Sequence, residues 1–178
     1  SDADAVSTGL HLGGGGFFIR TDDAQLRLLG YVQGTANVFD TTVVNEADQF
    51  AFDLRRARLD FLAGFHEDFQ VFVELDGAPA RTALVVGRMD WQLRDEALQL
   101  RAGKMVTQFS TENSRSSRAI DTVERYMALN SLFLLPALDT QKGVMFHGAV
   151  PGDAGLDWSL GLYNGNGKAN ANIDENND

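Results

Sequence analysis

Charged and apolar residues alternate between residues 52 and 62, and this alternation is the clearest chemical feature of the chain. In an extended strand, successive side chains point to opposite faces, so Arg56, Arg58 and Asp60 share one face. The opposite face is apolar: Ala57, Leu59 and Phe61. A guanidinium group keeps its charge at any relevant pH, and its planar fork matches the oxygens of phosphate and carboxylate. A row of arginines beside water could therefore attract and guide anions.

Other expected strands carry further charges on the same face. The set comprises five arginines and four acids: Arg27, Arg56, Arg58, Arg88, Arg101, Asp60, Glu74, Asp76 and Asp90. Because the count gives almost no net charge, a preference for anions would need guanidinium groups clustered at a narrow point. The alternative is that each arginine pairs with a cross-strand acid and only stabilises the sheet. Arg55 is out of phase with Arg56 and Arg58, so we expect it at a rim or on a β-bulge.

The titratable residues form no recognisable catalytic or metal-binding pattern. His11, His66 and His147 lack metal-ligand spacing, and residues 13–16 lack the Lys-Ser/Thr of a phosphate-binding loop. Ser110 with His147 is a conceivable nucleophilic pair, but no spacing places the two together. The Asn/Asp-rich segment after residue 164 lacks a calcium-loop spacing. We therefore expect no enzyme, no metal and no cofactor.

Seven segments alternate apolar and polar residues with a period of two, which predicts β-strands. They cover residues 26–38, 52–62, 69–76, 85–93, 98–103, 143–150 and 158–163. We expect residues 1–25 to be a flexible leader with a short strand at 17–20, residues 26–167 to form the β-structure, and residues 168–178 to be a polar loop or tail.

The links between the segments also alternate in length. Links near 66–68, 94–96 and 151–156 are short, whereas those at 40–49, at 104–142 and after 164 are mostly long, with 77–81 as an exception. Short turns at one end and long loops at the other are typical of outer-membrane barrels. Aromatic residues near the short turns suit an interfacial girdle, or the cap of a soluble core: Phe65, Phe69, Trp91 and Trp158.

The link over residues 104–142 is unusually long for an all-β pattern. Residues 119–135 are spaced for a helix with one apolar face. The charges of the link nearly balance: Lys104, Arg115, Arg118, Arg125 and Lys142 against Glu112, Asp121, Glu124 and Asp139. Such a loop would either fold into a barrel and narrow it or extend into solvent.

Bulk composition excludes some classes of protein. A formal charge of −10 over 178 residues argues against a general nucleic-acid binder. The absence of cysteine excludes disulfides and thiol chemistry. No apolar run approaches the ~20 residues of a transmembrane helix. The N-terminal residues show no secretory signal, so we expect any signal to be absent or already removed.

Five motifs, in order, resemble signatures of the phosphate-selective porin O and P family. They are residues 52–61 (FDLRRARLDF), 101–112 (RAGKMVTQFSTE), 123–125 (VER), 143–148 (GVMFHG) and 163–167 (YNGNG). The resemblance spans about residues 26–167. It departs from the family pattern at Gln108, where the family often has proline.

The resemblance implies an antiparallel transmembrane β-barrel of sixteen strands, of which about seven are present. It also implies an outer-membrane porin in bacteria, usually a homotrimer, through which small solutes, anions such as phosphate among them, diffuse passively. Arg55 and Arg56 match the family's arginine pair, and Arg27, Arg58, Arg88 and Arg101 would also line the pore. Residues 104–142 would be the constriction loop, with these charged residues: Lys104, Glu112, Arg115, Arg118, Glu124 and Arg125.

Seven strands leave two open edges, which cannot face lipid. As a porin, the chain would therefore be roughly the first half of the protein. One alternative is a complete eight-stranded barrel that includes residues 17–20. Another is a soluble β-sandwich that acts as a binding module, which predicts that six apolar residues face a protein core: Leu59, Phe61, Val71, Val73, Leu98 and Leu100.

Overall fold

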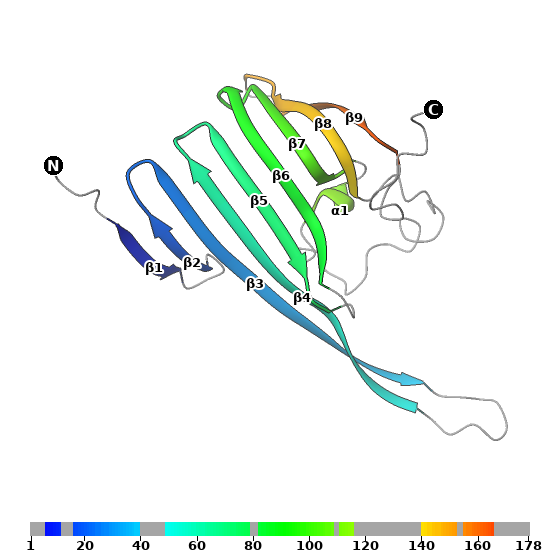
Figure 1. Cartoon of the computed structure of the whole chain (residues 1–178). Helices are drawn as coiled ribbons and strands as arrows, with labels where there is room; N and C mark the ends of the chain where they lie inside the picture. The colour runs from blue at the N-terminus through cyan, green and yellow to red at the C-terminus, as the bar shows by residue number, and fades with distance from the viewer. Residues whose placement is uncertain are drawn as a thin grey trace, which may run out of the picture.

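The structure, a computed structural model, describes residues 6–11, 16–39, 49–78, 82–108, 111–115, 140–152 and 155–165. These residues form nine strands and one short helix (Figure 1). In chain order they are β1 (Ser7–His11), β2 (Gly16–Arg20), β3 (Ala24–Phe39), β4 (Gln49–Phe65), β5 (Phe69–Asp76), β6 (Ala83–Arg94), β7 (Leu98–Val106), α1 (Thr111–Ser114), β8 (Thr140–Ala149) and β9 (Asp157–Tyr163).

The strands form one antiparallel sheet in which each strand pairs with the next along the chain, from β1 to β9. The predicted all-β antiparallel fold is confirmed. The structure has nine strands where the sequence indicated seven full strands and a short one at 17–20. The short strand is β2, and β1 forms within the segment expected as a flexible leader. β1 and β9 are the two edges of this sheet, so the described residues form neither an eight-stranded barrel nor a two-sheet sandwich.

The short turns lie at one end of the sheet. The links 21–23, 66–68 and 95–97 have three residues each, and 150–156 joins β8 to β9 at the same end. His66 and Asp95 hold positive φ values of 52° and 45°, which such tight turns require. The opposite end carries the links 12–15, 40–48, 77–82 and 107–139. The predicted asymmetry is therefore present, and the exception at 77–82 is a shorter link at the long-link end.

The strands around the long link extend further than the sequence indicated. β7 continues through Lys104 to Val106, and β8 begins at Thr140, so both ends of the expected loop 104–142 belong to the sheet. Within the link, α1 covers Thr111–Ser114. The helix expected over 119–135 and the polar tail expected over 168–178 lie outside the described residues.

Burial in this sheet is inverted relative to a water-soluble protein. Only three hydrophobic residues of the described set are buried: Val86, Met105 and Met145. Nine polar or charged residues are buried: Arg56, Asp60, Glu74, Asp76, Asp90, Thr107, Asn113, Thr140 and Gln141. Large hydrophobic side chains are instead widely exposed, as at Leu160 (69%) and Leu162 (81%).

The six residues that would form a sandwich core do not face one. Leu59 is 40% exposed, and Phe61, Val71, Val73, Leu98 and Leu100 are only partly covered. No second layer covers this face in the part of the chain that the structure describes. A contiguous apolar face of this size indicates a lipid or protein partner rather than water. No helix among the described residues has the length and hydropathy of a membrane span.

Candidate functional site

Strand register divides the sheet into two faces of opposite character. We call the face that carries Arg58, Asp60 and Asp90 the polar face, and the face that carries Leu59, Val73 and Leu100 the apolar face. Across neighbouring strands, Arg58 lies opposite Asp76, Asp60 opposite Glu74, and Asp90 opposite Arg101. The alternation predicted from the sequence thus brings the charges of four consecutive strands onto one surface.

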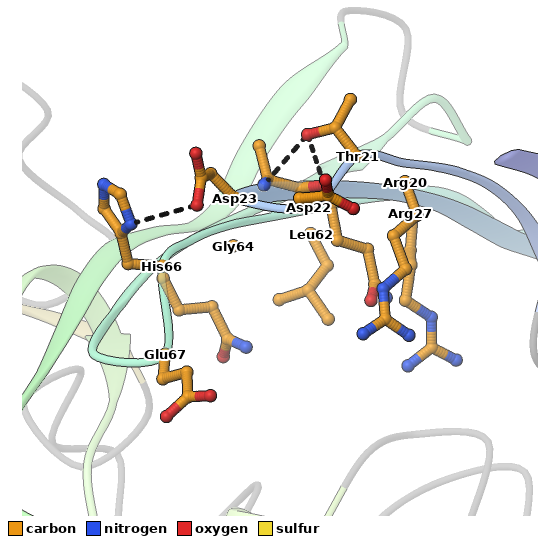
Figure 2. A pocket seen from close by; sticks show the side chains of 12 residues that line it. Arg20, Thr21, Asp22, Asp23, Arg27, Leu62, Gly64, His66 and Glu67 are labelled. Atoms are coloured by element: carbon orange, nitrogen blue, oxygen red, sulfur yellow. Dashed lines mark hydrogen bonds and ion pairs between the residues drawn. The ribbon is translucent and has the colours of Figure 1, made fainter. Parts of the chain in front are cut away.

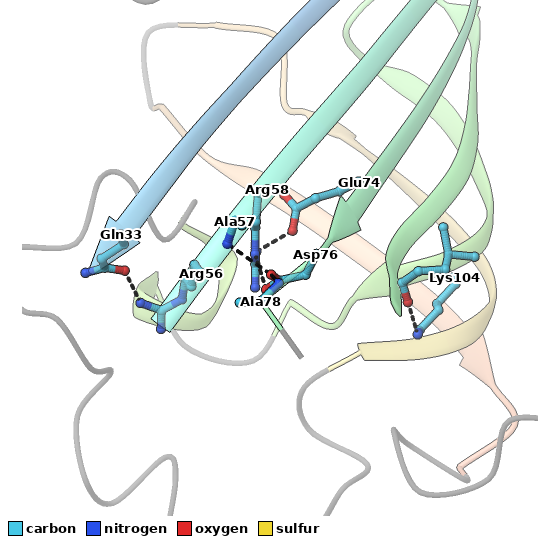
Figure 3. A network of polar contacts seen from close by, with 9 residues as sticks. Gln33, Arg56, Ala57, Arg58, Glu74, Asp76, Ala78 and Lys104 are labelled. Carbon is cyan, nitrogen blue, oxygen red and sulfur yellow. Dashed lines mark hydrogen bonds and ion pairs between the residues drawn. The ribbon is translucent and has the colours of Figure 1, made fainter. Parts of the chain in front are cut away.

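Arg58 lies at the centre of an acidic cluster near the long-link end of β5 (Figure 3). Its guanidinium pairs with Glu74, and its Nε lies 3.2 Å from Oδ2 of Asp76. Asp76 Oδ1 also accepts hydrogen bonds from the backbone N–H of Ala57 and of Ala78, both at 3.1 Å. Since two carboxylates surround one guanidinium, the cluster carries a net negative charge.

Arg56 has a different environment, although it lies on the same strand as Arg58, two residues earlier. It is 4% exposed and donates a hydrogen bond to Oε1 of Gln33, directly opposite it on β3. Because an amide is neutral, this contact does not neutralise the charge of Arg56. Arg55 is the extra residue of a β-bulge, since Gln33 pairs with Arg56 and Gly34 pairs with Leu54. The sequence predicted that Arg55 lies either at a rim or on a β-bulge, and the structure places it on a bulge.

Arg88 and Arg101 share a single acid, Asp90, nearer the short-turn end. The Nε of Arg88 lies 3.0 Å from Oδ2 of Asp90, and Arg101 pairs with the other oxygen. The guanidinium of Arg88 also lies over the ring of Phe72, 5.1 Å from its centroid. Both arginines are therefore ion-paired, but the cluster as a whole carries a net positive charge. The polar face thus bears an acidic cluster and a basic cluster at different heights.

Arg27 lines a cavity of about 520 Å³ at the short-turn end of the polar face (Figure 2). Arg20 projects into the same cavity from β2, close to Arg27. Nδ1 of His66 lies 3.8 Å from Oδ1 of Asp23, which joins two neighbouring turns at the cavity's rim. The sequence analysis did not identify Arg20. Phe17 and Ile19 alternate with Phe18 and Arg20, and this alternation would have predicted that Arg20 lies on the face opposite Phe17 and Ile19.

The residues expected in the constriction loop are only partly placed. Lys104 is not in the loop: it lies on β7, on the apolar face, and its Nζ donates to the carbonyl oxygen of Leu84. Glu112 belongs to α1, and Arg115 is exposed just after it. Three further expected residues lie outside the described residues: Arg118, Glu124 and Arg125.

The start of the long link is anchored against the sheet. Asn113 of α1 is 6% exposed, and its Nδ2 donates to the carbonyl oxygen of Thr107 at 3.2 Å. Met105 and Met145, on the polar face of β7 and β8, are 0% and 1% exposed. Figure 1 shows α1 beside the ends of these two strands. The link therefore begins beside these strand ends, with the buried Asn113 bonded to the residue that directly follows β7.

The geometry offers no catalytic or metal-binding constellation within the described ranges. No group of three or more histidine, aspartate and glutamate side chains there could hold a metal ion. Ser110, the conceivable nucleophile, lies outside those ranges, while His147 lies on β8. What the polar face can supply is a patterned electrostatic surface for ions that move along it.

Comparison with known proteins accounts for this combination of an apolar face and a charged face. The family model for phosphate-selective porin O and P matches residues 27–177, a range that includes most of β3 and all of β4 to β9. No curated protein matches the chain. Because the family match covers most of the sequence, the chain belongs to the phosphate-selective porin O and P family, a family of outer-membrane channels rather than of enzymes.

Proposed function

We propose that the chain forms part of the wall of a water-filled pore in the bacterial outer membrane, through which small solutes diffuse passively. The inverted burial of the sheet carries this proposal. In a membrane barrel, residues alternate between lipid and a polar interior, and strands must close so that no edge meets lipid. The apolar face would contact lipid and the polar face the lumen. Further strands would pair with the two edges, β1 and β9.

We further propose that the pore favours anions such as phosphate. The support is the net positive cluster of Arg88, Asp90 and Arg101. Anions would pass from one site to the next, held weakly enough to leave each. Residues 107–139, whose first part includes the buried Thr107 and Asn113, would narrow the pore. Glu112, Arg115, Arg118, Glu124 and Arg125 would then set the field at the constriction.

Planar-bilayer recording tests the proposed function. The outer-membrane protein that contains this chain would be purified in detergent and added to a bilayer between unequal KCl solutions. We expect ohmic current steps and a reversal potential biased toward chloride, and we expect added phosphate to reduce the chloride current. A homotrimer would be seen by native mass spectrometry. A protein that stays monodisperse without detergent and never conducts would contradict the proposal.

Asp90→Asn should increase the anion preference of the pore. Asp90 is 7% exposed and is shared by Arg88 and Arg101, so its neutralisation changes the charge of this cluster from about +1 to +2. We expect the reversal potential to move toward chloride. We also expect a stability loss of up to about 3 kcal/mol, since two guanidinium groups lose their partner.

Asp157→Asn is the matched control for this change. Asp157 is an exposed acid at the start of β9, so the same charge change occurs far from the cluster. Its effect on the reversal potential should be small. Equal shifts in the two variants would show that net charge, and not the cluster, sets selectivity.

A further inference from the structure

A histidine of β8 lies beside the basic cluster of the polar face, which consists of Arg88, Asp90 and Arg101. This histidine, His147, lies directly opposite Gln99 on β7, and Arg101 follows Gln99 by two residues on the same face. Such diagonal neighbours in an antiparallel pair are about 7–8 Å apart, within reach of a long side chain. The charged side chains that act on the ring of His147 are those of the cluster: Arg101, Asp90 and Arg88.

The acid of the cluster is not engaged with this ring. The Nε2 of His147 is buried and has no hydrogen-bond partner among the residues that the structure describes. The two oxygens of Asp90 pair instead with Arg88 and Arg101. The side chain of His147 is only partly buried, so a proton from the lumen can reach it. A proton on this ring would therefore add a positive charge to the cluster rather than complete an ion pair with Asp90.

The other groups around His147 keep their charge near neutral pH. On β9, Ser159 lies opposite His147, and the hydroxyl of Tyr163 donates to Sδ of Met145 at 3.3 Å. Tyrosine ordinarily titrates near pH 10, and aspartate and glutamate near pH 4. The other charged residues at this end of β6 and β9 are exposed: Arg94, Asp95, Glu96 and Asp157. Of these described residues, histidine is the type whose charge changes between pH 5 and pH 8.

We propose that His147 is a titratable member of the basic cluster, and that its protonation increases the preference of the pore for anions. The inference rests on the proposed function, because it requires the polar face to line a conducting lumen. Protonation would change the charge of the cluster from about +1 to about +2, the same change that Asp90→Asn makes. The imidazolium form is favoured as the pH falls, so the preference for anions should rise from pH 8 to pH 5.

Planar-bilayer recording of the complete outer-membrane protein between unequal KCl solutions, from pH 8 to pH 5, tests the inference. Chloride is the probe, because its charge does not change over this range. In the wild type we expect the permeability ratio of chloride to potassium to rise about fourfold as the pH falls. One added charge roughly 6 Å from the ions favours chloride and disfavours potassium by about twofold each. His147→Gln should lose this rise, and His147→Lys should hold the raised ratio at every pH.

His66→Gln is the matched control. His66 is an exposed histidine in the turn after β4, and its Nδ1 lies 3.8 Å from Oδ1 of Asp23. The same substitution there removes a titratable ring away from the cluster, so the rise with falling pH should persist. Ohmic current steps from each variant would show that it folds and inserts.

Several outcomes would overturn the inference. A permeability ratio that stays constant with pH in the wild type would show that His147 does not contribute to selectivity. A rise that survives in His147→Gln, or that His66→Gln abolishes, would assign the proton to another residue. Because conduction is first recorded at pH 8, a pore that conducts but lacks the His147-dependent rise overturns only this inference. A protein that never conducts overturns the proposed function as well.

Discussion

Replacing Val73 by arginine is expected to destabilise the protein in a lipid bilayer by about 2–4 kcal/mol, the cost of an arginine near the midplane of a membrane barrel. Val73 lies on the apolar face of β5, between Phe61 and Gly87 of the neighbouring strands. It is four residues from Phe69 at the short turn, which is about 13 Å along the strand. In an apolar band of roughly 25 Å, this position is near the middle. Urea titration of the protein folded in phospholipid vesicles would measure the loss.

Gln70→Arg is the matched control on the same strand. Gln70 lies on the polar face and is exposed in the cavity at the short-turn end, so the same new side chain would meet water there. We expect a change within about 0.5 kcal/mol, as for other surface substitutions. If both variants were equally stable, Val73 would not face lipid, and the assignment of the two faces would be wrong.

Much of the fold could be predicted because each strand lies between a polar and an apolar environment. Its polar and apolar side chains therefore alternate with a period of two. This pattern gave the all-β class, the polar and apolar faces, and the short-turn end. β1 escaped detection because Ser7–His11 contains a single large apolar residue, too few to show a period. The end of β7 was misplaced for a related reason. Lys104 breaks the apolar series at a position that the backbone still holds in the sheet.

The charged groups of the site could be named from the sequence, but their partners could not. Alternation tells which face a residue occupies, whereas pairing depends on the register, which turns and bulges set. A register shift between Glu74 and Leu75, next to Asp76, shows how local these effects are. A count of five arginines against four acids therefore suggested a nearly neutral wall. The structure instead separates an acidic cluster around Arg58 from a basic cluster around Asp90.

Arg58→Ala is expected to have the largest effect of any single substitution on the polar face. Glu74 and Asp76, each 8% exposed, would lose the guanidinium between them. Removing one partner of a buried ion pair costs about 3–5 kcal/mol, because the remaining charge stays buried. The polar face would also lose one positive charge beside these two carboxylates, so the reversal potential should move toward potassium. Vesicle unfolding and bilayer recording measure the two effects on the same preparation.

Arg56→Ala separates selectivity from stability. Its hydrogen-bond partner Gln33 is neutral, so its loss strands no carboxylate at that contact and should cost less stability than Arg58→Ala. If arginines guide anions, Arg56→Ala should still move the reversal potential toward potassium. The double variant, Arg56→Ala with Arg58→Ala, should move it further. Arg58→Lys, which keeps the charge, should leave the potential near the wild-type value. An unchanged potential in Arg56→Ala and in the double variant would mean that these arginines only stabilise the wall, and that the anion path lies elsewhere.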